Sequence, residues 1–200
     1  MTGRLRNAEK LIATAIDEGT PVADIFEKAI VPGMTEAGEL YKKGASGIPM
    51  ILSSARCVRC GLDILRPYLE KEGYHPNGRI ILGTVEGDLH DIGKNMVALM
   101  FEGAGFEVID LGVDVSEKQF IQAVRENPDV SIVCISSLLT TGHSEMRHVV
   151  RALRREKNGS RLKIMVGGGA VTKEFASEIG ADAYTDNAVE AAETAKTFII

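Results

Sequence analysis

A change of hydrophobic period between Glu72 and Gly78 constrains the fold more than any other feature of the sequence. Beyond it, short apolar runs alternate with amphipathic stretches of helical spacing. The runs predict strands over Ile80 to Val85, Phe106 to Leu111, Val130 to Ser136, Leu162 to Val166 and a weaker Ala183 to Thr185. The amphipathic stretches predict helices over Gly93 to Glu102, Glu117 to Glu126, Ser144 to Lys157, Lys173 to Ile179 and Ala188 to Phe198. This alternation predicts right-handed crossovers and a parallel sheet, so we expect a flavodoxin-like or Rossmann-like doubly wound α/β domain of strand order 2-1-3-4-5.

The residues before the change carry helical spacing throughout. Apolar side chains recur three or four positions apart in four segments, Leu11 to Ile16, Val22 to Ile30, Met34 to Tyr41 and Ile51 to Leu69. Pro32-Gly33 should break or kink the second of these runs. About four or five short helices of this kind form a bundle. We therefore expect two domains, a helical bundle in residues 1–75 and the α/β domain in residues 76–200.

Composition excludes several classes of protein. The 200 residues are 44% hydrophobic, which is enough for a packed core. The net charge of −5 argues against a nucleic-acid partner, and the basic stretch from Arg147 to Lys157 has the spacing of a solvated helix face. No apolar run approaches the ~20 residues that span a bilayer, and the start of the chain lacks the apolar core of a signal peptide. The three cysteines suit a reducing cytoplasm, so we expect a cytoplasmic protein without membrane contact.

Small and polar residues gather in the loops where a parallel sheet binds ligands. Such ligands lie outside the carboxyl ends of the strands, near the point where the strand order reverses. The loop after the first strand runs from Glu86 to Gly93, the loop after the third from Ser136 to His143, and the loop after the fourth from Gly167 to Ala170. We expect these three loops to share one edge of the sheet.

His90 is the candidate metal ligand of the first loop. A neutral imidazole binds metal well when an acceptor holds its second nitrogen, and Asp88 could be that acceptor. Gly93 would let the following helix start close to a large ligand. Zinc or iron would need two or three further ligands, and His143 is the only nearby histidine. One protein ligand suffices only if a cofactor completes the coordination sphere; the alternative is an exposed histidine with Asp88 as a helix N-cap.

The glycines of the third loop indicate close approach to the backbone. Gly167 to Gly169 would let an extended ligand pass near the main chain, whereas a turn that needs positive φ explains one glycine but not three. Ser136 and Thr140 add uncharged hydroxyls. Neither a GxxxxGK[ST] loop nor a GxGxxG fingerprint after the first strand is present, which argues against nucleoside triphosphates and dinucleotides.

Together these motifs resemble a corrinoid-binding signature. Asp88-x-His90-x-x-Gly93, Ser136-x-Leu138 and Gly167-Gly168 occur in the order and spacing found in the cobalamin-binding domain of methionine synthase and its relatives. The stretch from Gly33 through Tyr41 and Pro49 to Arg56 resembles the helical cap domain of the same family. The resemblance covers nearly the whole chain. A cap plus binding domain of this length is similar to the small corrinoid proteins of anaerobic methyltransferase systems.

The resemblance implies a cobalamin or related corrinoid as cofactor. His90 would replace the dimethylbenzimidazole base as lower ligand of cobalt, and Asp88 would accept a hydrogen bond from the imidazole. The nucleotide tail would run between the loops after the third and fourth strands. Tyr41 and Ile48 would cover the upper face, ordinary bundle packing being the alternative for both. The expected cofactor-binding residues are Gly87, Asp88, His90, Asp91, Ile92, Gly93, Ser136, Leu138, Thr140, Gly167, Gly168, Tyr41 and Ile48.

One position departs from the pattern of methionine synthase. There a hydroxyl residue shortly after the serine motif extends the Asp–His pair into a triad, and that position is Gly142 here. Either the relay ends at Asp88, or Thr141 or a water molecule substitutes.

The resemblance implies a methyl carrier. Co(I) would accept a methyl group from a substrate-specific methyltransferase, and methyl-Co(III) would pass it to a second methyltransferase with tetrahydrofolate or coenzyme M as acceptor. Methanol, methylamines, methoxyaromatics and betaines are donors in such systems, and a reductive activator of the corrinoid is a further expected partner. The chain has no room for a catalytic barrel, so we expect a carrier subunit rather than a complete enzyme.

Other interpretations remain open at this point. A cobalamin-dependent sensor would normally add an output module of ~70 residues. A radical-mutase subunit would not need the helical cap, and a receiver domain would need an acidic cluster at the sheet edge. Cys57 and Cys60 form a CxxC pattern, but its place on an apolar helix favours packing over redox chemistry. Cys134 is expected in the core.

Overall fold

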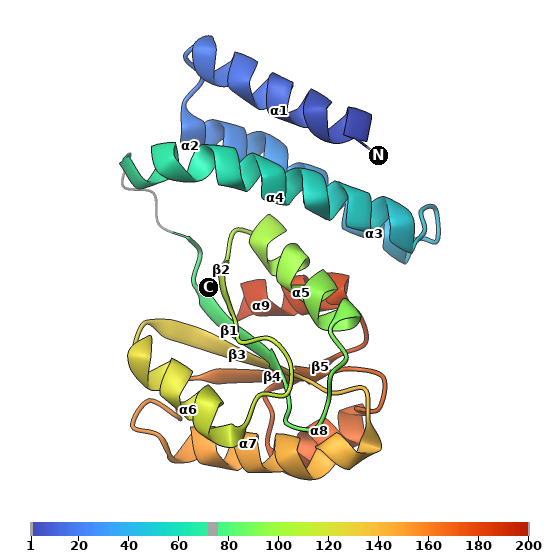
Figure 1. The fold of residues 1–200 in the computed structure, drawn as a ribbon, viewed down its shortest axis with the longest axis vertical. Coiled ribbons are helices and arrows are strands. Elements are labelled where there is room, and N and C mark those ends of the chain that lie inside the picture. Colours follow the sequence, from blue (N-terminus) through green and yellow to red (C-terminus); the bar gives the residue numbers. More distant parts are fainter. Residues whose placement is uncertain (1, 72–75, 200) are drawn as a thin grey trace. The chain divides into compact units, whose positions relative to one another are not determined.

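The computed structural model describes residues 2–71 and 76–199 (Figure 1). The chain divides into two compact units, residues 1–76 with 102–105 and residues 77–101 with 106–200. The predicted division between Glu72 and Gly78 falls partly on residues 72–75, which lie outside the described residues.

The first unit is helical. Its elements are α1 (Thr2–Asp17), α2 (Val22–Ile25), a π-helical turn η1 (Phe26–Ile30), α3 (Val31–Lys42) and α4 (Ile48–Lys71). The long α4 contacts α1, α2 and α3. One buried cluster joins α1, α2, η1 and α4 through apolar side chains, namely Ile12, Val22, Ile25, Phe26, Leu65 and Leu69.

The Pro32 region shows how the chain accommodates a proline within a helical run. Of the predicted break or kink, the break does not occur, because α2, η1 and α3 follow one another without a gap. Proline has no N–H to donate and its ring crowds the preceding turn. The five residues before Val31 adopt the wider π-helical turn instead, and Pro32 lies in the first turn of α3, where a missing N–H is tolerated.

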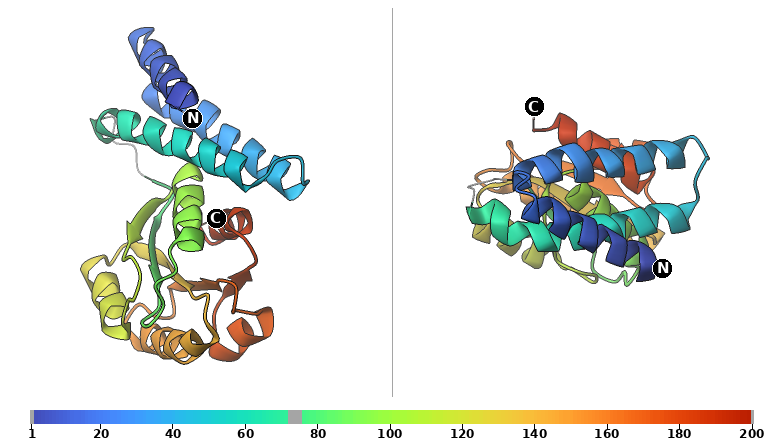
Figure 2. Two further views of the ribbon diagram at one scale, coloured as in Figure 1. Left: turned by 45° about the vertical axis from the view of Figure 1, so that its right-hand side comes forward. Right: turned by 90° about the horizontal axis from the view of Figure 1, so that it is seen from above.

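The second unit is the doubly wound α/β domain that the sequence predicts. Five parallel strands, β1 (Arg79–Thr84), β2 (Glu107–Asp110), β3 (Val130–Ser136), β4 (Lys163–Gly167) and β5 (Ala183–Thr185), lie in the order β2-β1-β3-β4-β5. The helices are α5 (Ile92–Gly103), α6 (Glu117–Glu126), α7 (His143–Arg155), α8 (Lys173–Ile179) and α9 (Ala188–Thr197), with a short 3₁₀ turn η2 (Thr140–Gly142). In Figure 2, α5 and α9 cover one face of the sheet and α6, α7 and α8 cover the other.

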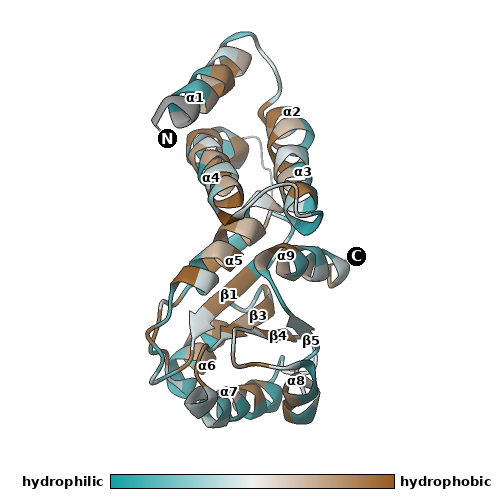
Figure 3. Cartoon of the chain, turned by 90° about the vertical axis from the view of Figure 1, so that its right-hand side faces the viewer, coloured by the Kyte–Doolittle hydropathy of each residue, from teal (hydrophilic) through white to brown (hydrophobic). Residues whose placement is uncertain are grey.

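Burial follows this layering. The central strands β1 and β3 are mostly apolar (Figure 3), and side chains from Ile80 to Val85 are almost wholly buried. The edge strand β2 is shorter than predicted, because only Glu107 to Asp110 pair with β1. Cys134 lies in the core of β3 as predicted, and burial raises the pKa of its thiol to about 12.

Two arginines of the basic stretch of α7 pair with acidic side chains. Arg147 lies 2.8 Å from Glu178, and Arg154 lies 2.6 Å from Asp182 and also donates to three backbone carbonyls. Cys60 is half-buried on α4, with Sγ 3.3 Å from Glu9 Oε1. Across residues 2–71 and 76–199, none of the helices combines the length and the apolar character that a bilayer crossing requires.

Candidate functional site

Three loops meet at the carboxyl edge of the sheet. Thr84 at the end of β1 is in register with Ser136 at the end of β3, and Ser136 is in register with Gly167 at the end of β4. The main chains remain joined beyond the strands, since Val85 N donates to Ser136 O and Ser137 N donates to Gly167 O, each at 3.1 Å. The predicted gathering of the three loops is therefore present in the structure.

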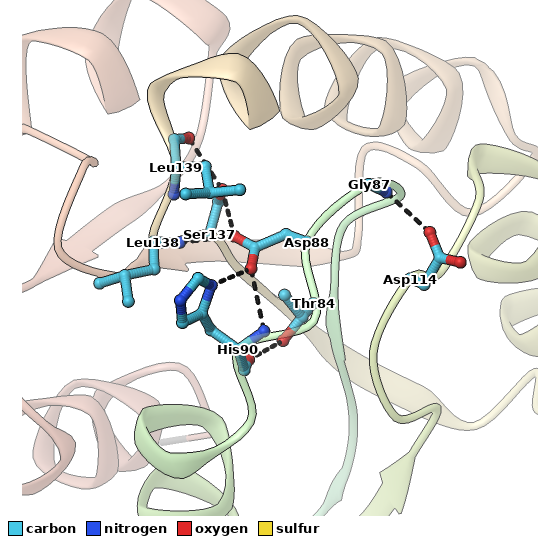
Figure 4. A network of polar contacts seen from close by, with 8 residues as sticks. All are labelled: Thr84, Gly87, Asp88, His90, Asp114, Ser137, Leu138 and Leu139. Atoms are coloured by element: carbon cyan, nitrogen blue, oxygen red, sulfur yellow. Dashed lines mark hydrogen bonds and ion pairs between the residues drawn. The ribbon is translucent and has the colours of Figure 1, made fainter.

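Asp88 is the buried centre of this edge (Figure 4). Its side chain is 1% exposed and both carboxylate oxygens are saturated. Oδ1 accepts from His90 N at 3.0 Å and contacts His90 Nδ1 at 2.6 Å, while Oδ2 accepts from Ser137 Oγ at 2.9 Å and Leu138 N at 2.7 Å. Burial alone would raise the pKa of Asp88, but these hydrogen bonds favour the charged form and lower the pKa to about 2.

This depressed pKa makes a prediction for stability against pH. The unfolded carboxyl titrates near 3.8, so the charged network stabilises the fold above that pH and its contribution is lost as pH falls toward 2. The full contribution is about 2 kcal/mol, and about half of it should disappear between pH 5 and pH 3. In Asp88→Asn, the amide NH₂ faces hydrogen-bond donors, so the variant should be less stable at neutral pH. Urea unfolding should show the difference between wild type and variant narrowing as pH falls; a constant difference would contradict the charged network.

His90 presents a half-exposed imidazole with a fixed orientation. Its side chain is 52% exposed, and Nδ1 faces Asp88, which leaves Nε2 on the side of the ring away from the carboxylate (Figure 4). The backbone of the same loop is held at three further points. The buried Thr84 Oγ1 donates to His90 O at 3.1 Å, and Gly87 N donates to Asp114 Oδ1 at 2.7 Å. Asp114 N in turn donates to Asp88 O at 3.1 Å.

The start of α5 beside His90 is also anchored. The buried Lys94 forms an ion pair with Asp110 at 2.5 Å, which ties the first turn of α5 to the end of β2. Asp91 accepts from Asn95 through both its backbone and its side chain, at 2.7 and 3.2 Å. A Cβ built on the exposed Gly93 has nothing within 4 Å, so the space beside the helix start is open, and the predicted role of Gly93 beside a large ligand stays a prediction.

Several large apolar side chains around the loop that carries His90 are exposed to solvent. Leu89 is 72% exposed and Ile92 is 76% exposed, on either side of His90 in the sequence. Leu138 and Leu139, in the loop after β3, are also exposed. Several exposed apolar side chains near one polar ligand group are typical of a binding surface for an apolar partner.

Contacts within the protein explain why glycine occupies the positions from Gly167 to Gly169. Gly168 has a φ of +117°, and a Cβ there would lie 2.0 Å from Ser137 O. A Cβ on Gly169 would lie 2.5 Å from Leu138 Cδ1, and one on Gly167 would lie 3.2 Å from a backbone oxygen of β5. The need for a positive φ in a turn thus accounts for only Gly168, as predicted from the sequence. Clearance for neighbouring protein atoms is an additional reason that the sequence did not reveal.

Ser137 is the functional candidate that the sequence argument missed. The sequence singled out Ser136, which pairs within the ladder, whereas the next residue contacts Asp88. The sequence does contain a sign of this residue, because Ser136 and Ser137 are consecutive and only one of two consecutive side chains can point into the site. Thr140 and Thr141 are exposed, and among the hydrogen bonds of the described residues none joins Thr141 to Asp88. Gly142 is buried directly against Ser137.

Tyr41 and Ile48 belong to the helical unit. Tyr41 is half-buried in α3, and Ile48 is the exposed first residue of α4. Their role over a cofactor stays a prediction.

The donor set indicates what kind of metal group fits. No cluster of three or more His, Cys, Asp and Glu side chains occurs within residues 2–71 and 76–199. The sheet edge instead offers one oriented imidazole, exposed leucine and isoleucine side chains and open space at Gly93. This arrangement fits a metal already held by a large, largely apolar ligand and does not fit a zinc or iron ion bound by protein alone.

Comparisons with known proteins indicate the same kind of metal group. A family model described as a B12 binding domain matches residues 78–193, and a second model of the same description matches residues 1–66. Dimethylamine corrinoid protein 3 of Methanosarcina acetivorans is 39% identical over 180 residues, which cover 90% of this chain and 84% of the relative. Trimethylamine corrinoid protein 1 of Methanosarcina mazei is 34% identical over 195 residues, covering 96% and 90%.

Two solved structures extend the likeness to three dimensions. A cobalamin-binding protein from Desulfitobacterium hafniense gives a TM-score of 0.79 at 31% identity, covering 97% of this chain and 92% of that one. A chain of the methanol:cobalamin methyltransferase complex MtaBC from Methanosarcina barkeri gives a TM-score of 0.81 at 29% identity, covering 94% and 71%.

Proposed function

The chain belongs to the B12-binding family of corrinoid proteins, and on this premise we propose that it carries a methyl group between two methyltransferases. A corrinoid supplies a cobalt ion that can take up and release a methyl group. The observation that carries the proposal is the half-exposed imidazole of His90, oriented by a buried carboxylate and surrounded by exposed apolar side chains. A carrier needs such an open site, because donor and acceptor enzymes must reach the same group in turn.

His90 is the residue that would hold the cobalt. Its Nδ1 contacts Asp88 at 2.6 Å, which fixes the proton on that nitrogen and leaves the Nε2 lone pair for a metal. The Asp88 carboxylate cannot rotate away from His90 Nδ1, because three other hydrogen bonds hold its two oxygens. The protein thereby presents one ligand in one tautomer.

The loops after β3 and β4 would bind the nucleotide tail. Ser136, Leu138, Thr140, Gly167 and Gly168 lie at the carboxyl edge of the sheet that also bears His90. The two loops lie side by side, since Ser137 N donates to Gly167 O at 3.1 Å and a Cβ on Gly168 would meet the Ser137 backbone. In the helical unit, Tyr41 and Ile48 would cover the opposite face of the corrinoid, and Gly87, Asp91 and Ile92 would complete the surroundings of the lower ligand.

Gly93 offers a test of where the corrinoid lies. We expect Gly93→Leu to fill the open space beside the helix start and to weaken cobalamin binding at least about tenfold. Stability of the protein without cofactor should hold or rise, because glycine within a helix costs about 1 kcal/mol relative to leucine. Titration with cobalamin and urea unfolding measure the two quantities. Lys118→Leu, an exposed change in the first turn of α6, is the matched control. Unchanged affinity in Gly93→Leu would place the corrinoid elsewhere.

The partners follow from the carrier role. We propose a substrate-specific methyltransferase as donor enzyme, and the relatives named for dimethylamine and trimethylamine favour a methylamine as its substrate. The neighbour from the methanol:cobalamin methyltransferase complex supports docking of such an enzyme on a protein of this fold. A second methyltransferase would hand the group to tetrahydrofolate or coenzyme M, and a reductive activator would restore corrinoid that has been oxidised.

A transfer experiment tests the function. The protein is loaded with ¹³C-methylcobalamin and incubated in the dark with a methylamine-type methyltransferase partner or a thiol-methylating partner. NMR should show the ¹³C signal moving from the protein to the acceptor thiol or amine. Signal that stays on the protein with every partner would contradict the carrier role. Light-triggered loss of the adenosyl ligand from protein loaded with adenosylcobalamin would favour a sensor instead.

A further inference from the structure

We propose that Ser137 positions the Asp88–His90 pair, and that Gly142 is glycine because Ser137 Oγ fills the space where its side chain would be. The proposal rests on the assignment of His90 as the metal ligand. It adds a positioning residue and a reciprocal relation between two positions of the chain.

The hydroxyl of Ser137 has one best acceptor. Oγ is 2.9 Å from Asp88 Oδ2 and 3.0 Å from Leu139 O, while Leu139 N donates to Oγ at 3.3 Å. A hydroxyl has one proton, and a hydrogen bond to an ionised carboxylate is roughly twice as strong as one to a neutral carbonyl. Ser137 therefore accepts from Leu139 N and donates to Asp88 (Figure 4). Its side chain is wholly buried, so no water replaces this donor.

Gly142 faces the same hydroxyl from η2. A Cβ built on Gly142 would lie 2.3 Å from Ser137 Oγ, 3.2 Å from Ser137 Cβ and 3.0 Å from Val85 Cγ2. The φ of Gly142 is −75°, which any residue can adopt, so its backbone does not require glycine. The requirement for glycine comes from space alone. Positions 137 and 142 thus share one side-chain volume beside Asp88 Oδ2, and only one of them can fill it.

This geometry predicts that the hydroxyl can be moved from one position to the other. Ser137→Ala removes the donor from Asp88 and empties the volume. Gly142→Ser alone overlaps Ser137 and should lower stability. In the double variant Ser137→Ala with Gly142→Ser, the new hydroxyl takes the vacated volume within reach of Asp88 Oδ2. The matched control, Ser137→Ala with Gly142→Ala, fills the volume without a hydroxyl.

The test reads the orientation of His90 in two ways. In the protein without cofactor, long-range ¹H–¹⁵N spectra report how fully the His90 proton is held on Nδ1. In the cobalamin-loaded protein, a pH titration of the visible spectrum reports the equilibrium between histidine bound to and released from cobalt. We expect Ser137→Ala to shift that equilibrium about tenfold toward release, the size of one charge-assisted hydrogen bond. The serine double variant should recover most of the shift, and the alanine double variant should not.

Two results overturn the proposal. Equal spectra of Ser137→Ala and wild type in both measurements would remove Ser137 as a positioning residue. Recovery by the alanine double variant as complete as by the serine one would mean that packing, not the hydroxyl, holds Asp88. If wild type itself shows no histidine on cobalt, the ligand assignment fails instead, and the spectra of the protein without cofactor still decide the role of Ser137.

Discussion

His90→Ala is expected to abolish the histidine-bound spectrum of cobalamin on this protein while leaving the fold intact. The imidazole is half-exposed, so the main cost to stability is the lost hydrogen bond to the buried Asp88 carboxylate, and the free energy of unfolding should fall by about 1–3 kcal/mol. The loss at the metal should be complete, because His143, the other histidine of these loops, is held by Ala170 O at 2.9 Å from its Nε2 and by stacking on Phe175. The visible spectrum should change to that of a corrinoid without a histidine base.

Two controls make the result specific. His148→Ala removes an exposed histidine from α7, where its nearest carboxylate is Glu145 at 3.8 Å, and should leave the spectrum unchanged. Free imidazole added to His90→Ala should restore the bound spectrum, since it can occupy the space vacated beside Asp88. A His90→Ala spectrum identical to wild type would rule out His90 as the ligand.

Gly168→Ala is expected to have the largest effect on stability. The backbone there has a φ of +117°, which strains any L side chain, and the new Cβ would lie 2.0 Å from a backbone oxygen of Ser137. Neither group can move freely, because Ser137 N is bonded to Gly167 O and its side chain to Asp88. We expect a loss of more than about 3 kcal/mol in the free energy of unfolding, with the site disrupted as well.

The variant Gly180→Ala serves as the comparison, because it introduces backbone strain at a positive φ without the steric overlap that Gly168→Ala would create. Gly180, at the end of α8, has a φ of +81° and nothing within 4 Å of a built Cβ. This change carries only the cost of a left-handed alanine, about 1–2 kcal/mol. Urea unfolding of both variants should show the clear difference that the contact with Ser137 predicts. Equal losses would mean that the loops after β3 and β4 are not in close contact.

Local patterns sufficed for the architecture and for the first loop. The strand order follows from alternation and handedness, and the spacing of Asp88 and His90 places both in one loop, where the predicted contact is present. These features depend on residues close together in the chain, which is why a sequence pattern can carry them.

The missed features depend on contacts between distant segments. Whether Ser136 or Ser137 faces Asp88 is set by where β3 leaves the ladder, a one-residue difference that reverses the side chain. The space that excludes a side chain at Gly168 and at Gly142 is taken by Ser137, an arrangement that arises only when the loops meet. The π-helical turn before Pro32, through which α2, η1 and α3 stay continuous, was likewise not predicted from the local sequence.

The most direct test of the central claim is electron paramagnetic resonance of the protein loaded with cobalamin and reduced to the Co(II) state. The protein is prepared once with natural histidine and once with ¹⁵N-histidine. If His90 has replaced the dimethylbenzimidazole base, the nitrogen splitting should change from the pattern of a spin-one nucleus to that of a spin-half nucleus, and His90→Ala should lose it. A pattern that stays that of ¹⁴N in the labelled protein would show that the cofactor keeps its own base, and would contradict the account of this site.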